Sequence, residues 1–158
     1  MTLDQFWGII EKVHRKSGAD IDKRFDLLET EVGNLSLAEV QSFDAHFTDC
    51  LDRAYTWELW GAAYVIGGGC SDDGFWDFRS TLITCGKKIF ERALKDPESL
   101  ADLDRELGES LQVEGLQFLY PHAKAERASM ARALRELQVE RGSLLDKEIQ
   151  QWVFDWNR

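Results

Sequence analysis

The sequence predicts an all-α protein, a single compact domain of about seven to nine helices with no significant sheet. Apolar residues recur at steps of three and four along most of the 158 residues, as they do on one face of an α-helix. Capping residues and glycine stops divide these stretches into separate helices. No segment shows the alternating polarity, or the density of valine and threonine, that is typical of strands. The length also suits one domain, because a second core would have too little apolar surface to bury.

The first two helices are predicted by a capping box and two apolar stripes. Thr2 and Gln5 are spaced so that each side chain can satisfy a backbone donor of the other residue. The helix that follows runs to about residue 17 and stops at Gly18. A second stripe lies within residues 21–32 and stops at Gly33. The apolar residues are Phe6, Ile9, Ile10 and Val13 in the first helix, and Ile21, Phe25, Leu28 and Val32 in the second.

The third and fourth helices lie on either side of residue 55. Ser36 and Glu39 form a second capping box, and the apolar stripe after them predicts a helix to about residue 54. Residues 57–65 predict a short helix that is apolar on every side, so we expect it to be buried. Three glycines at residues 67–69 interrupt regular structure, because fixing their backbone costs much entropy. The apolar residues are Leu37, Val40, Phe43, Phe47, Leu51 and Ala54, then Trp57, Trp60, Tyr64 and Val65.

Three to five further helices are predicted in the rest of the chain. Ser71 or Asp72 caps a fifth helix, which Gly86 either ends or kinks. The sequence Asp96-Pro97-Glu98 is typical of a helix start and predicts a short acidic helix. Residues 113–120 suggest another turn or two. Residues 121–141 are rich in strong helix formers, and a final amphipathic helix after Ser143 carries Leu145, Ile149, Trp152 and Trp156.

The composition favours a cytoplasmic protein that does not bind nucleic acid or an anionic membrane. The net charge is −10, with residues 96–114 contributing −6 and residues 121–141 contributing +2, and phosphate-binding surfaces need the opposite sign. Asp4 stands where a signal peptide would carry basic residues, and no apolar run approaches the roughly 18 residues of a membrane span. Three widely spaced cysteines, Cys50, Cys70 and Cys85, do not form a disulfide scaffold.

The glycine-rich segment at residues 67–77 contains the most distinctive polar residues. Asp72 and Asp73 are adjacent at a predicted helix start, and Asp77 lies one turn beyond Asp73. Paired carboxylates at this spacing can hold Mg²⁺ or Ca²⁺, which would suit a metal-dependent hydrolase. The interpretation that we favour is a helix cap, because further oxygen ligands are not evident in the sequence.

Other catalytic and cofactor sites are not supported by the sequence. The glycines lack the following Lys-Ser or Lys-Thr of a phosphate-binding loop, and two adjacent acids would repel a phosphate. Cys70 at a helix start resembles a nucleophile, yet those acids raise the pKa of its thiol. No Cys-x-x-Cys or His-x-x-x-His pair suggests zinc. We therefore expect no catalytic residues and no cofactor.

Aromatic and acidic residues are the candidate binding residues. Trp57, Trp60 and Trp76 lie close in sequence to the glycine segment, where core packing competes with a binding groove as their role. An aromatic rim beside acidic side chains suits a positively charged protein partner. The acidic candidates are Asp72, Asp73, Asp77, Asp102, Asp104, Glu106 and Glu109.

Two sequence blocks occur in a fixed order with several shorter motifs. The blocks are residues 57–64 (Trp-Glu-Leu-Trp-Gly-Ala-Ala-Tyr) and 69–75 (Gly-Cys-Ser-Asp-Asp-Gly-Phe), and the shorter motifs include residues 77–79 (Asp-Phe-Arg). This combination resembles the bacterial family catalogued as domain of unknown function 4240, over residues 3–105. The resemblance implies a small intracellular helical protein and brings no established reaction or catalytic residues. Beyond about Gly108 the chain departs from the family pattern.

Taken together, these features favour a non-enzymatic binding protein. We expect a domain spanning residues 1–158, with a family-like body at 1–105 and a helical extension at 106–158 packed on it. We expect the partner to be a basic protein, because acidic inhibitors such as immunity proteins and antitoxins associate rapidly with basic targets through electrostatic steering. The alternative is the divalent-metal hydrolase at Asp72, Asp73 and Asp77.

Overall fold

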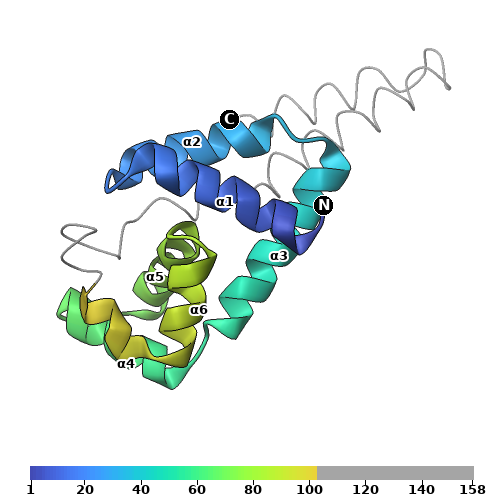
Figure 1. Cartoon of the computed structure of the whole chain (residues 1–158). Helices are drawn as coiled ribbons and strands as arrows, with labels where there is room; N and C mark the ends of the chain where they lie inside the picture. The colour runs from blue at the N-terminus through green and yellow to red at the C-terminus, as the bar shows by residue number, and fades with distance from the viewer. Residues whose placement is uncertain (103–158) are drawn as a thin grey trace, which may run out of the picture. The chain divides into compact units, whose positions relative to one another are not determined.

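The computed structural model describes residues 1–102, which form helices joined by short turns (Figure 1). No strand occurs within these residues, so the all-α class is confirmed for the part of the chain that the structure describes. The helices predicted after residue 102 lie outside it, and the total of seven to nine stays a prediction. Six α-helices and one short 3₁₀ helix are described: α1 (Leu3–Ser17), α2 (Ile21–Gly33), α3 (Leu37–Arg53), α4 (Trp57–Gly67), α5 (Asp72–Thr84), α6 (Lys87–Lys95) and η1 (Pro97–Asp102).

Local capping fixes where α1 and α3 begin. At α1, the Thr2 hydroxyl accepts from the Gln5 amide at 3.3 Å, and the Gln5 side chain accepts from the Thr2 amide at 2.7 Å. Ser36 and Glu39 make the same reciprocal pair of hydrogen bonds at α3. Both capping boxes predicted from the sequence are therefore confirmed.

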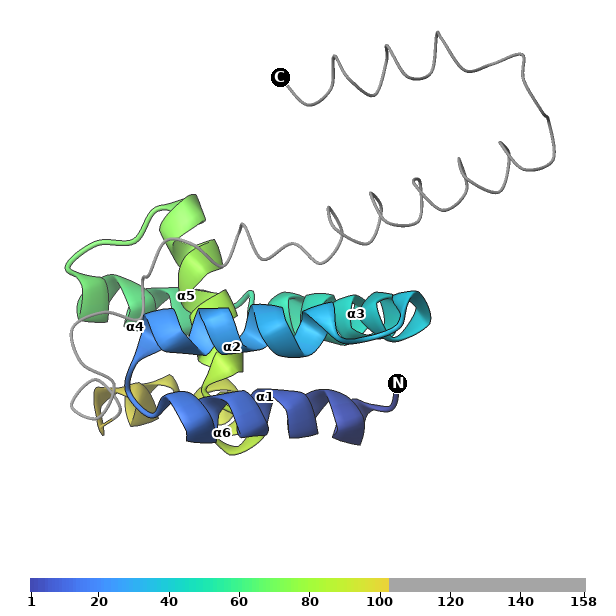
Figure 2. The same ribbon diagram turned by 90° about the horizontal axis from the view of Figure 1, so that it is seen from above.

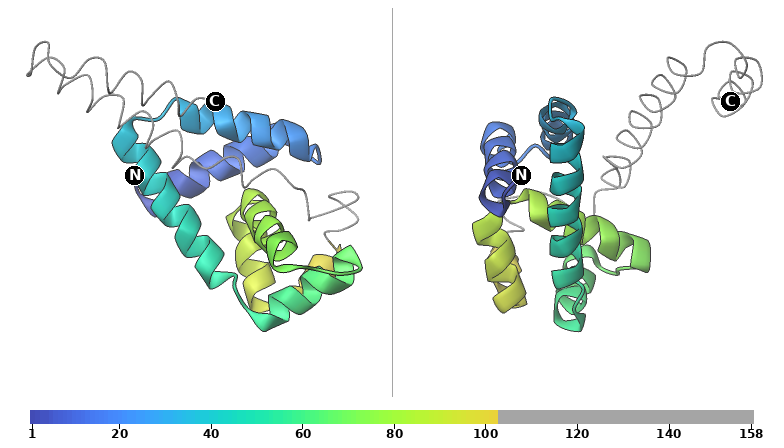
Figure 3. Two further views of the ribbon diagram at one scale, coloured as in Figure 1. Left: turned by 180° about the vertical axis from the view of Figure 1, so that it is seen from behind. Right: turned by 90° about the vertical axis from the view of Figure 1, so that its right-hand side faces the viewer.

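Helix α5 occupies the centre of the described core. It packs against α1, α3, α4 and α6, and every residue from 77 to 84 is buried. Helices α1 and α2 lie alongside each other, as Figure 2 shows, and α3 extends from α2 to α4 (Figure 3). Figure 1 shows that α4 lies at the end of this region away from α1 and α2. The position of α4 leaves one of its faces without a neighbouring helix among those described.

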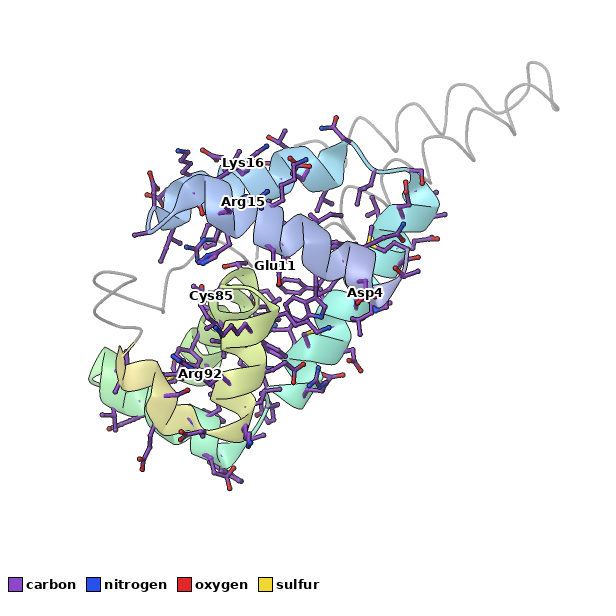
Figure 4. All side chains as sticks on the ribbon, viewed as in Figure 1. Asp4, Glu11, Arg15, Lys16, Cys85 and Arg92 are labelled. Carbon is purple, nitrogen blue, oxygen red and sulfur yellow. The ribbon has the colours of Figure 1, made fainter. Side chains whose placement is uncertain are left out.

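Glycines with positive φ end the helix before α5 and begin the helix after it. Gly68 ends α4 in the left-handed conformation at φ 65°. Residues that carry a Cβ adopt this backbone conformation only at a cost in free energy. Gly86, at φ 95°, ends the α5 segment and begins α6, so it separates two helices and does not kink one. A Cβ at Gly86 would lie 3.6 Å from Cγ of Glu11, and Figure 4 labels Glu11 on α1 near this junction.

A helix begins at Pro97, as predicted, and within residues 97–102 it is a 3₁₀ helix, whose tighter turn begins with a hydrogen bond from the Ser99 amide to the Asp96 carbonyl at 3.1 Å. The prediction that the helix at residues 57–65 is buried on every side is wrong. Helix α4 is not buried on all sides, because α5 and η1 cover only part of it. Among the described helices, we find none with the length and hydropathy that crossing a membrane requires.

Candidate partner-binding site

Helix α4 exposes a stripe of large apolar side chains. Trp57, Tyr64 and Val65 are 82%, 59% and 80% exposed, and with Gly61 they follow the i, i+4, i+7, i+8 spacing of one helix face. The opposite face holds Leu59, which is fully buried in the core. We call Trp57, Gly61, Tyr64 and Val65 the α4 stripe. Large apolar side chains gathered on one exposed face are typical of an interaction site.

A stack of aromatic rings supports one end of the α4 stripe. The Trp57 ring lies on the Trp60 ring, with centroids 5.5 Å apart and an interplanar angle of 13°. Trp60 in turn stacks on the buried Phe75 of α5 at 4.7 Å. The indole N–H of Trp60 donates to the Cys70 carbonyl at 3.1 Å, which holds the start of α5 against α4. The stack restrains Trp57, so a partner would lose less side-chain entropy on binding it.

A buried arginine joins this aromatic stack to α3. The guanidinium of Arg79 lies 4.7 Å from the Tyr55 ring centroid and 4.8 Å from that of Phe75. It donates to the carbonyls of Leu51 at 2.9 Å and Phe75 at 3.2 Å. Burial lowers the pKa of Arg79, while Tyr55 and Asp52 act in the opposite direction. In the sequence, Arg79 stands in the Asp-Phe-Arg motif one turn after Phe75, but that pattern does not predict its burial or its contacts with the aromatic rings.

Exposed carboxylates accompany the α4 stripe. Glu58 lies in the first turn of α4, and Asp72 and Asp73 lie in the first turn of α5; all three are exposed. No lysine or arginine occurs between Arg53 and Arg79 in the sequence. The surface formed by α4 and the start of α5 therefore combines apolar and negative groups.

The structure separates the three aspartates of the glycine-rich segment. Ser71 caps α5, with its hydroxyl accepting from the Gly74 amide at 3.1 Å, as the capping interpretation predicts. Asp77 is 4% exposed and belongs to the core, whereas Asp73 is exposed, so the two carboxylates that the sequence spacing places one turn apart differ in burial. Within residues 1–102, no group of three or more His, Cys, Asp or Glu side chains is placed to hold a metal ion.

The other predicted residues divide between partly buried and undescribed positions. Trp76 is partly buried against the core, and Cys70 is half-buried. Burial raises the pKa of the Cys70 thiol, which makes it a weaker nucleophile at neutral pH. Asp104, Glu106 and Glu109 lie outside the described residues, as does the side chain of Asp102.

The described part of the chain is a helical body that presents an aromatic and acidic surface on one helix. Residues 1–126 match the family described as a protein of unknown function, DUF4240, and the chain belongs to that family. The match continues past residue 105, the expected end of the family-like body, so the expectation that the chain departs from the family pattern beyond about Gly108 is wrong. No curated protein and no solved structure matches the chain significantly.

Proposed function

We propose that this protein is a non-enzymatic cytosolic binding module that recognises a basic protein. The observation that carries the proposal is the α4 stripe, in which Trp57, Tyr64 and Val65 are exposed and the Trp57 ring is held by stacking on Trp60. Tryptophan and tyrosine are the residues most often found at the energetic centre of protein interfaces. An inhibitor or regulatory partner, of the kind represented by immunity proteins and antitoxins, is the most concrete form of this role.

The charge distribution supports a basic partner. Residues 1–102 contain 19 acidic and 11 basic side chains, and every charged side chain between Arg53 and Arg79 is acidic. A positively charged target would be steered toward such a surface, and an arginine or lysine could stack on the exposed Trp57 ring. Because these carboxylates are exposed, we expect them mainly to raise the association rate. This effect should weaken as salt is added.

Peptide selection on the full chain tests this function. A displayed library of random peptides of about 16 residues, long enough to form a helix, is selected on immobilised protein. We expect the enriched peptides to contain an excess of lysine and arginine. Their affinity should fall at least about tenfold on Trp57→Ser, and association should slow as NaCl is added. The control is Leu3→Ser, which removes a different exposed apolar side chain, on α1.

Three results would contradict the proposal. The first is enrichment of neutral or acidic peptides, and the second is equal loss of binding in Trp57→Ser and Leu3→Ser. The third is the absence of any enriched peptide. Circular dichroism of both variants, with melting temperatures matching that of the wild-type protein, ensures that lost binding is not lost folding.

A further inference from the structure

We propose that the basic partner binds as an amphipathic α-helix that crosses α4 at Gly61. This inference rests on the proposed function and adds the shape of the bound segment. It is carried by the place of Gly61 in the α4 stripe, one turn after Trp57 and one turn before Val65.

Gly61 forms a low point between large exposed side chains. A Cβ placed on Gly61 would meet no atom within 4 Å, so the space above this residue is open. Trp57 and Val65 stand on either side, 82% and 80% exposed. Two helices approach to about 8 Å between axes when small residues lie at their crossing point, and flanking side chains then fill the grooves. The α4 stripe has this arrangement.

A helix suits this surface better than an extended segment. An extended segment that binds as a β-strand gains affinity by hydrogen-bonding its backbone to a free strand edge, and residues 1–102 contain no strand. A helix satisfies its own backbone donors and acceptors, so it can bind through side chains alone. The apolar face of the partner helix would cover Tyr64 and Val65, while basic residues beside that face would approach Glu58 and the start of α5.

Charge also favours a different protein over a second copy of this chain. A symmetric dimer through α4 would bring two sets of the same carboxylates, Glu58, Asp72 and Asp73, to one interface. Like charges at an interface oppose association, whereas lysine and arginine on a partner helix reverse the sign. The occupant is therefore a basic helix of another protein.

Titration with a synthetic helix tests the inference. The probe is an amphipathic peptide of about 18 residues with leucines on one face, an alanine at the centre of that face, and lysines and arginines beside it. The control peptide has the same composition but contains D-residues that prevent a helix. The full chain is used as wild type, Gly61→Ala, Gly61→Leu, Trp57→Ser and Gly8→Leu. Gly8 is a matched site, because it is also an exposed glycine within a helix and has open space above it.

We expect wild type to bind the helical probe at least about tenfold more tightly than the D-residue peptide. Gly61→Leu should weaken binding of the helical probe at least about tenfold, Gly61→Ala should weaken it less, and Gly8→Leu should not change it. Neither leucine variant should melt below wild type, since leucine has the higher helix propensity and both positions are open.

Several outcomes would overturn the helix proposal. If Trp57→Ser removes binding while Gly61→Leu and Gly8→Leu behave alike, the partner does not cross at Gly61 and the proposed function still stands. Equal binding of the two peptides, or no binding of the helical probe, also rejects a helical partner. If Trp57→Ser has no effect either, both proposals fail. If sedimentation shows a wild-type dimer that Gly61→Leu dissociates, the occupant is a second copy.

Discussion

Two arginines are buried in the described core, and within residues 1–102 neither forms an ion pair. Arg79 is held by carbonyls and aromatic faces. Arg24 is fully buried and donates to the Ser17 hydroxyl at 3.1 Å and the Gly18 carbonyl at 2.5 Å. Its third contact is the thiol of Cys85 at 3.5 Å. These contacts connect the α1–α2 turn to the end of α5, where Figure 4 labels Cys85.

Replacing Arg24 tests whether this connection stabilises the fold. We expect Arg24→Ala to lower the free energy of unfolding by about 3 kcal/mol, because it leaves a cavity and removes the guanidinium hydrogen bond to the Gly18 carbonyl. Urea denaturation followed by circular dichroism measures the change. Arg15→Ala, at an exposed position of α1, is the control and should shift stability by less than about 0.5 kcal/mol. Equal stability of both variants would show that the contacts of Arg24 are dispensable.

His14 gives the protein a predictable pH dependence. Burial lowers the pKa of His14 below its ordinary value of 6.5, and the nearby positive charge of Arg24 lowers it further, while Glu11 opposes both. The unfolded chain therefore binds a proton more readily than the folded chain. The stability contributed by neutral His14 is complete above pH 6.5 and is lost as the pH falls through the folded pKa. Urea midpoints between pH 7.5 and 5 should fall more in wild type than in His14→Gln, and identical slopes would contradict this assignment.

At the scale of the element, the start of α5 is a helix cap of the kind that the sequence predicts. Ser71, in extended conformation, accepts from the Gly74 amide, and Asp72 and Asp73 follow in the first turn, where they favour the positive end of the helix dipole. These local interactions account for the three polar residues without a bound ion.

Substitutions in the first turn of α5 and at its cap distinguish capping from cation binding. Ser71→Ala should destabilise the protein by about 1 kcal/mol, whereas Asp73→Ala should cost no more than about 0.5 kcal/mol. Thermal melting of both variants, with and without Mg²⁺, measures the effects. A rise in the melting temperature of wild type with Mg²⁺ that Asp73→Ala abolishes would instead identify a cation site.

At the scale of the whole described body, burial divides the three cysteines. Cys50 and Cys85 lie in the core, while Cys70 is half-buried in the segment before α5. Burial raises the pKa of Cys50 to about 11, with Arg53 opposing this shift and Asp49 and Glu91 adding to it. Burial also raises the pKa of Cys85, with Arg24 opposing it. Thiolates at these two positions are scarce at neutral pH and are shielded from reagents.

Thiol labelling therefore reports on opening of the core. We expect iodoacetamide at pH 8 to modify Cys70 first, and to modify Cys50 and Cys85 only as the protein unfolds, at closely similar rates. Mass spectrometry of peptides from timed samples measures each site. Labelling in urea, where all three cysteines should react alike, is the control. Early modification of Cys85 alone would show that the end of α5 opens independently of the rest.

The site was only partly predictable from the sequence. Trp57 and Trp60 lie three residues apart in one apolar helix, yet Trp60 stacks on Phe75 while Trp57 stays exposed. Asp73 and Asp77 are four residues apart, yet the first is exposed and the second lies in the core. Sequence spacing identifies residues on a common helix face, but it does not show which face another helix covers.

The sequence by itself determined where α1, α3 and α5 begin and the family to which the chain belongs. Capping residues such as Thr2, Ser36 and Ser71 accept hydrogen bonds from amides three residues away, so their effect can be predicted from neighbouring residues in the sequence. Only the tertiary structure decided that α4 exposes Trp57, Tyr64 and Val65 and that Arg24 and Arg79 are buried. The reason is physical: burial depends on contacts between helices that are far apart in the sequence. Whether a helix face belongs to the core or to the surface depends on whether another element packs against it.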